Sequence, residues 1–146
     1  MSVDPALADA GLLDTNIIVL RQWIDAAELP ARMAISAITL AELSAGPHKV
    51  RSNTEQKDYD EHEERARRLE ILQRVENEFD PIPFDAEAAR IYGRIAAGRK
   101  PRHRLADQMI AAIAIANGLP LYTTNPAHYQ GLDKLLTIIS IKRPAH

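Results

Sequence analysis

The sequence predicts an α/β domain in which a mostly parallel β-sheet is covered by helices on both faces. Short apolar runs typical of buried strands alternate along the chain with longer segments of helical periodicity. A length of 146 residues suits one domain, and 46% hydrophobic with 26% charged residues is the composition of a globular protein. No internal repeat or low-complexity tract divides the chain. We expect one domain over residues 11–141, between a leader at 1–10 and a C-terminal tail at 142–146.

The first half of the chain alternates between strand and helix. Its predicted elements are a short strand ending at Asp14, a helix to about Glu28, a buried strand at 33–37, a helix at about 39–43, and one or two helices within 52–78. Pro30 and Pro47 end the first two helices, since proline lacks the backbone N–H that a helix needs. The acidic first part of segment 52–78 indicates a solvated face.

The second half continues the alternation. Its predicted elements are a short strand at 80–84, a helix capped by Asp85, a basic loop at 98–104, a helix from Leu105 to Asn117, and strands at 121–123 and 136–140. The longest apolar run, residues 109–116, is far shorter than the roughly 20 residues of a bilayer span, so it predicts a buried helix. The leader carries acids where an export signal needs positive charge. We therefore expect a cytoplasmic protein without a membrane segment.

Composition and motifs exclude several classes of protein. The chain has no Cys, which removes disulfides, thiolate metal sites and thiol nucleophiles. Its formal net charge of -2 provides no general attraction for nucleic acid, so any such contact needs a local patch. The six glycines form no phosphate-binding loop, and the five histidines lack zinc spacing. Hydrolases with a nucleophile elbow are excluded as well.

Isolated polar residues lie at the ends of the predicted strands. Asp14 ends the first strand, Glu42 falls in the first turn of the helix after the second, Asp107 opens a later helix, and Asn125 follows the strand at 121–123. In a parallel α/β sheet, ligands bind outside the carboxyl ends of the strands. These four side chains are therefore candidates for one common site.

Each candidate also has a purely structural explanation. Asp14 is a possible helix N-cap, and Glu42 fits a capping box that Thr39 would begin. Asp107 suits the positive end of a helix dipole, and Asn125 with Pro126 is a turn signature. The combination favours a metal site, because clustered carboxylates repel one another unless a cation neutralises them. Mg²⁺ and Mn²⁺ bind oxygen ligands and need neither Cys nor His.

Four segments resemble the motifs of PIN-domain ribonucleases. They are Leu12-Leu-Asp14-Thr-Asn16, Ser36-Ala-Ile-Thr-Leu-Ala-Glu42-Leu, Ala106-Asp107 followed by Ile110-Ala-Ala112, and Tyr122-Thr-Thr-Asn125-Pro. Their order and spacing are specific, and within the superfamily they resemble VapC toxins of bacterial toxin–antitoxin pairs. The resemblance covers about residues 11–141 and implies a PIN-like three-layer sandwich with a five-stranded sheet.

The resemblance also implies a function. It implies a Mg²⁺-dependent endoribonuclease, with Mn²⁺ as a substitute, that acts as a toxin on structured RNA such as tRNA or rRNA and inhibits translation. A homodimer is implied, as is a VapB-like antitoxin that forms a hetero-oligomer with it across the active-site groove. Asp14, Glu42 and Asp107 match the metal ligands, and Asn125 completes the catalytic set. Asn16 and Thr123 match polar positions that orient substrate, water or acids.

One departure from the family pattern affects the metal site. Many relatives have an acid three residues after the Asn of the last motif, followed by an aromatic residue, whereas this chain has His128 and Tyr129. Three carboxylates suffice for one metal ion. His128 is a secondary candidate, either as a neutral ligand or proton donor or as an exposed loop residue.

The basic loop at 98–104 precedes the helix of Asp107. Arg102 and Arg104 are candidates for contacts with RNA phosphates, and a solvated loop that balances the acidic helix is the alternative. Loss of the fourth acid allows a second interpretation of the whole chain, a catalytically weakened PIN-like module that binds RNA or protein. A structural protein whose partner face is the helical segment at 55–78 is a third.

Overall fold

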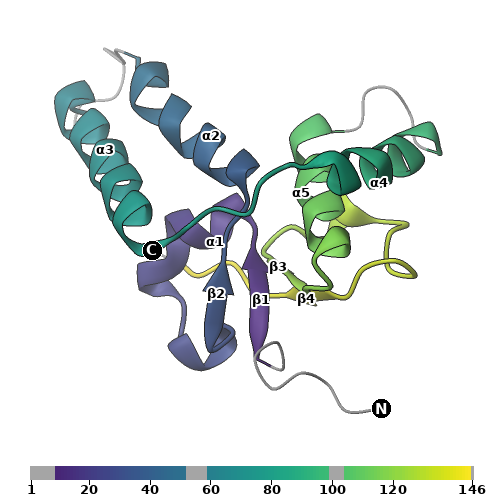
Figure 1. Cartoon of the computed structure of the whole chain (residues 1–146). Helices are drawn as coiled ribbons and strands as arrows, with labels where there is room; N and C mark the ends of the chain where they lie inside the picture. The colour runs from purple at the N-terminus through teal and green to yellow at the C-terminus, as the bar shows by residue number, and fades with distance from the viewer. Residues whose placement is uncertain (1–8, 52–58, 99–103, 146) are drawn as a thin grey trace.

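A four-stranded parallel sheet forms the centre of the molecule in the computed structural model, which describes residues 9–51, 59–98 and 104–145 (Figure 1). The strands are β1 (Ala10–Leu13), β2 (Arg32–Ala34), β3 (Leu121–Thr123) and β4 (Ile138–Ser140), in the order β2-β1-β3-β4. All three strand pairs are parallel. The predicted α/β class is confirmed, and all carboxyl ends of the strands meet at one edge.

Helices cover both faces of this sheet. They are α1 (Thr15–Leu20), α2 (Ala37–Ala45), α3 (Glu61–Glu78), α4 (Ala86–Ala97) and α5 (Leu105–Ala116). In Figure 1, α2 and α3 lie on one side of the sheet and α4 and α5 on the other. None of the helices in the described ranges is long and apolar enough to cross a membrane.

Two hydrophobic clusters hold the three layers together. Leu12 of β1 packs in a cluster with residues of α4 and α5, while its neighbour Leu13 packs with residues of α1, α2 and α3. This division follows from the strand geometry, since successive side chains point to opposite faces of a sheet. Residues Ile110 to Ala114 of α5 are all fully buried, as expected for a helix that is apolar all round.

The predicted helix from residue 15 to Glu28 is interrupted. After α1 ends at Leu20, two short 3₁₀ turns follow, η1 (Arg21–Trp23) and η2 (Ala26–Glu28). The Asp25 side chain accepts a hydrogen bond from the backbone N–H of Ala27 at 3.0 Å and so starts a new turn. Leu20, the last residue of α1, and Ile24, which follows η1, are nevertheless buried, so both apolar positions of the predicted helix belong to the core.

The expected fifth strand at 80–84 is wrong as a strand. Ile82 forms a single parallel bridge with Ser36, in which its N–H donates to the Ile35 carbonyl at 2.9 Å and its carbonyl accepts from the Ala37 N–H at 2.8 Å. Proline on each side of Ile82 provides no N–H, so the ladder does not extend. Segments 52–58 and 99–103, and most of the predicted leader, lie outside the described residues. The domain boundaries stay a prediction.

Candidate active site

Asp14 lies at the centre of the carboxyl edge, directly after β1. It is buried, with 3% of its surface exposed. One carboxylate oxygen, Oδ1, accepts from the Thr15 N–H at 2.9 Å, and Oδ2 accepts from the Thr123 hydroxyl at 2.8 Å. Asp14 therefore caps α1, as its structural explanation required, and at the same time is tied to the end of β3.

Glu42 does not cap its helix. The cap of α2 is Ser36, whose hydroxyl accepts from the Thr39 N–H at 3.0 Å, so the helix begins at Ala37. The predicted start at Thr39 and the capping box are therefore wrong, and Glu42 lies in the second turn. Its carboxylate instead accepts from the Thr15 hydroxyl at 2.6 Å. Glu42 thus faces the residue that follows Asp14, from the adjacent helix.

Thr15 is a residue that the sequence analysis missed as part of the site. Its hydroxyl donates to Glu42, and it lies 2.9 Å from the hydroxyl of Thr39, which is fully buried. Because the single proton of Thr15 goes to Glu42, Thr39 must donate to Thr15. Thr15 follows Asp14 in the first motif, but its role depends on how α2 packs beside it. A local sequence pattern does not predict that packing.

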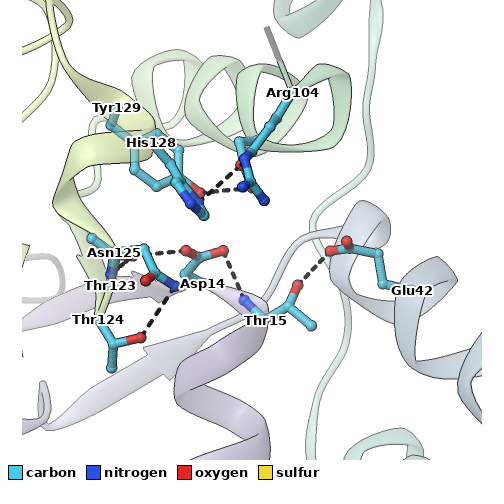
Figure 2. A network of polar contacts seen from close by, with 10 residues as sticks. Asp14, Thr15, Glu42, Arg104, Thr123, Thr124, Asn125, His128 and Tyr129 are labelled. Carbon is cyan, nitrogen blue, oxygen red and sulfur yellow. Dashed lines mark hydrogen bonds and ion pairs between the residues drawn. The ribbon is translucent and has the colours of Figure 1, made fainter. Parts of the chain in front are cut away.

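Asp107 approaches the same edge from the first turn of α5. Its Oδ2 lies 3.2 Å from His128 Nδ1 and 4.0 Å from Arg104 Nε, while its Oδ1 lies 3.5 Å from the Tyr129 hydroxyl. The Asp107 side chain is 16% exposed. Figure 2 shows Asp14 between the residues of β3 and the following turn on one side and Thr15 with Glu42 on the other.

The remaining predicted residues differ in how closely they join this group. The Asn125 N–H donates to Thr123 Oγ1 at 2.9 Å, which links it through Thr123 to Asp14. Asn16 lies in the first turn of α1 and takes no part in the contacts of Asp14, Glu42 and Asp107 described above. Arg104 is largely exposed beside Asp107, whereas Arg102 lies outside the described residues.

Two carboxyl groups of the site are poorly stabilised in their charged form. Partial burial raises the pKa of Glu42, and Asp107 and Asp14 raise it further against the opposing hydrogen bond from Thr15. Burial also raises the pKa of Asp107, with Asp14 adding to it against His128 and Arg104. The three carboxylates therefore repel one another, and the cationic side chains near them compensate incompletely.

The donor set suits a hard divalent cation held partly through water. Among the described residues, no three Asp, Glu or His side chains close around a single point. Mg²⁺ usually keeps several waters and takes only one or two carboxylates directly. Oxygen donors with uncompensated charge fit such an ion, whereas direct ligation by all three carboxylates would require side-chain movement.

Comparisons with known proteins agree with this fold. The family model of the PIN domain matches residues 11–130. Ribonuclease VapC5 of Mycobacterium tuberculosis is 34% identical over 131 residues, which cover 84% of this chain and 86% of the relative. The chain therefore belongs to the PIN-domain family, and its relatives within that family include VapC proteins.

Two solved structures resemble the whole chain. A member of the VapBC family of toxin–antitoxin systems, VapBC-5 from M. tuberculosis, has a TM-score of 0.69 and 31% identity, covering 92% of this chain and 98% of that one. DNA-bound VapBC from Salmonella typhimurium has a TM-score of 0.61 and 26% identity, covering 88% and 96%. The resemblance found in the four sequence motifs is thus confirmed at the level of family and fold.

Proposed function

We propose that this protein is a Mg²⁺-dependent endoribonuclease, with Mn²⁺ as a substitute, and the toxin of a type II toxin–antitoxin pair. It hydrolyses phosphodiester bonds in structured RNA, tRNA or rRNA, and thereby inhibits translation until an antitoxin binds. The observation that carries this proposal is the meeting of Asp14, Glu42 and Asp107 at one edge of the sheet. Two of them have raised pKa values, which is the electrostatic condition that a cation relieves.

Each residue of the site has a defined part in this proposal. Asp14, Glu42 and Asp107 would hold the cation. When bound, a divalent cation supplies Lewis-acid stabilisation of the phosphate and a more acidic water. Thr123 fixes Asp14 through its 2.8 Å hydrogen bond. The Asn125 side-chain amide, whose Nδ2 lies 3.4 Å from the Thr124 hydroxyl, orients water or substrate.

Residues around this centre extend the proposal to the substrate. Arg104 is exposed beside Asp107 and carries a charge suited to an RNA phosphate. Arg102 precedes it by two positions in the same basic stretch of sequence, and Asn16 is a further polar residue of the first motif. Readable bases occur in loops and bulges rather than in A-form helices, which favours structured RNA with unpaired segments.

The partners follow from the relatives. VapBC-5 is a member of a family of toxin–antitoxin systems, which supports a VapB-like antitoxin for this chain and a hetero-oligomer with it. The homodimer of the toxin is part of the proposal through the family resemblance. We expect the protein to act in the cytoplasm, where its RNA substrates are. A catalytically weakened PIN-like module that binds RNA or protein is the alternative that the missing fourth acid suggests.

Cleavage of total RNA by the purified protein tests the catalytic proposal. We expect discrete fragments with Mg²⁺ or Mn²⁺, none with excess chelator, and none with Asp14→Asn. Asp25→Asn is the matched control: it makes the same chemical change at an exposed cap of a 3₁₀ turn, where Asn is an equally good cap, and should leave cleavage intact. Metal-independent cleavage, or unchanged cleavage by Asp14→Asn, would contradict the proposal.

Growth of cells that express the chain tests the toxin role. Expression of the wild-type chain alone should arrest growth, and expression of Asp107→Asn should not. Co-expression with the product of the neighbouring reading frame should restore growth. Arrest by Asp107→Asn as strong as by the wild type would separate toxicity from the carboxylate site and contradict the proposed mechanism.

A further inference from the structure

Two consecutive residues of one short turn contact the carboxylate of Asp107. The turn, η4 (Pro126–Tyr129), begins directly after Asn125. His128 is partly exposed, at 24%, whereas Tyr129 is fully buried and is among the largest side chains of the core. The turn thus places the His128 imidazole at the surface of the site and the Tyr129 side chain in the core below it.

The two side chains address different oxygens of Asp107. His128 Nδ1 lies 3.2 Å from Oδ2, and the Tyr129 hydroxyl lies 3.5 Å from Oδ1. Figure 2 shows both side chains above Asp14, on the side of Arg104. Each carboxylate oxygen of Asp107 is therefore in contact with a group that carries no negative charge, the His128 imidazole or the Tyr129 hydroxyl.

A buried phenol needs an acceptor, and the Tyr129 hydroxyl lies 3.5 Å from Asp107 Oδ1 and also faces the carboxylate of Asp14. Burial of Tyr129, with Asp14 and Asp107 facing it, raises the pKa of the phenol far above its usual range. The hydroxyl therefore keeps its proton and stays a donor. A phenylalanine would fill the same space in the core but would leave Oδ1 of Asp107 without this donor.

We propose that His128 and Tyr129 are positioning residues that hold the Asp107 carboxylate toward Asp14 before a divalent cation binds. The inference rests on the proposed function, because it assigns a role at the same metal site. Without such a hold, repulsion from Asp14 would turn the Asp107 side chain away, and cation binding would have to bring it back. Groups behind metal ligands commonly supply this orientation, and their loss weakens metal binding about 10–100-fold.

This arrangement also bears on how many cations the site takes. His128 and Tyr129 add donors but no further anionic ligand, so the negative charge at the edge stays at three carboxylates. We therefore expect the folded full-length protein to bind one divalent cation in the absence of RNA.

Titration of Mn²⁺ into the purified full-length protein, followed by the electron paramagnetic resonance signal of free Mn²⁺, tests the proposal. We expect one ion per chain and a dissociation constant about 10-fold higher in Tyr129→Phe. Tyr92→Phe, which removes the same hydroxyl from an α4 side chain packed on Phe84, should bind Mn²⁺ like the wild type. His128→Ala should lose about as much affinity as Tyr129→Phe, and His128→Asn should restore most of it, because the Asn amide takes the place of Nδ1.

The readouts separate positioning from a structural role. A structural role alone would lower the melting temperature of the metal-free variants and leave the Mn²⁺ dissociation constant unchanged. Unchanged or tighter Mn²⁺ binding by either Tyr129→Phe or His128→Ala overturns the proposal while the function stands. His128→Ala, at a partly exposed position, decides the matter if Tyr129→Phe does not fold. Absence of Mn²⁺ binding by the wild type would overturn both.

Discussion

The Glu42 carboxylate at the sheet edge destabilises the folded protein at neutral pH. Glu42 is exposed as a residue, yet its carboxyl group has a raised pKa, first through partial burial and then through Asp107 and Asp14. A carboxyl group whose pKa is raised on folding binds protons more readily in the folded state. Its contribution to stability is therefore present at low pH and is lost as the pH rises through the raised pKa. At neutral pH the charge is a net cost.

Glu42→Gln should therefore stabilise the metal-free protein. We expect the melting temperature at pH 7 to rise by about 1–3 °C, the range that a fraction of a kcal/mol produces in a domain of this size. The gain should shrink as the pH falls through the raised pKa of Glu42, above the usual 4.5, because the carboxyl group then takes up a proton. Calorimetry over this pH range is the measurement. Glu76→Gln, an exposed change on α3, is the control, and a lower melting temperature for Glu42→Gln at pH 7 would contradict the electrostatic account.

Among the secondary-structure elements, α3 is fixed to the rest of the molecule through charged side chains. Arg68 donates to the Gly46 carbonyl at 3.0 Å and to Glu64 at 2.8 Å, and Glu64 also pairs with Arg67 at 2.7 Å. Hydrogen bonds from Arg67 and then Arg68 lower the pKa of Glu64 to about 2. Glu64 thus orients the arginine that joins α3 to the end of α2.

Glu64→Gln should loosen this connection. The expected loss is about 0.2–1 kcal/mol in the free energy of unfolding at pH 7, the range of surface pairs. Because the folded pKa is lowered, this stabilisation is present above the unfolded pKa and disappears as the pH falls from about 4.5 toward 2. Urea unfolding at several pH values measures it. Glu70→Gln, whose pair with Arg74 stays within α3, should cost less, and an equal loss from the two variants would argue against the connection.

The elements also show what sequence can and cannot predict. Local periodicity and capping predicted a strand ending at Asp14, a buried helix from Leu105 to Asn117 and a cap at Asp85. The structure has all three, with β1 ending at Leu13 and α5 ending at Ala116. The break after Leu20 and the shift of the α2 cap from Thr39 to Ser36 were missed, because competing polar side chains at neighbouring positions satisfy the same local pattern. Proline on each side of Ile82 limited the strand predicted at 80–84 to a single bridge.

At the scale of the whole molecule, the site exists because the sheet is parallel. Asp14, Glu42 and Asp107 come from elements far apart in sequence and meet where the strands end, so the pattern of acids at strand ends could be predicted. The roles of Thr15 and Tyr129 could not, since they depend on packing between layers. The molecule carries a net charge of -2, so the RNA binding that we propose requires a local basic surface.

Charge reversal at Arg102 and Arg104 should weaken RNA binding. Each phosphate contact that is lost should reduce the slope of log affinity against log salt by roughly one. Filter binding of RNA to the catalytically inactive Asp14→Asn background at several KCl concentrations measures both effects. Reversal of Arg90 on α4, an exposed arginine outside the basic loop, is the control. A salt slope unchanged by Arg102→Glu and Arg104→Glu would remove the loop from the RNA contact.

The central claim is that three carboxylates from distant parts of the chain act together on one divalent cation. Isothermal titration calorimetry of Mg²⁺ or Mn²⁺ into the purified protein tests it most directly. The account predicts saturable uptake of one ion per chain by the wild type, lost in Asp14→Asn and retained in Asp25→Asn. Absence of saturable uptake by the wild type, or equal uptake by Asp14→Asn, would contradict it.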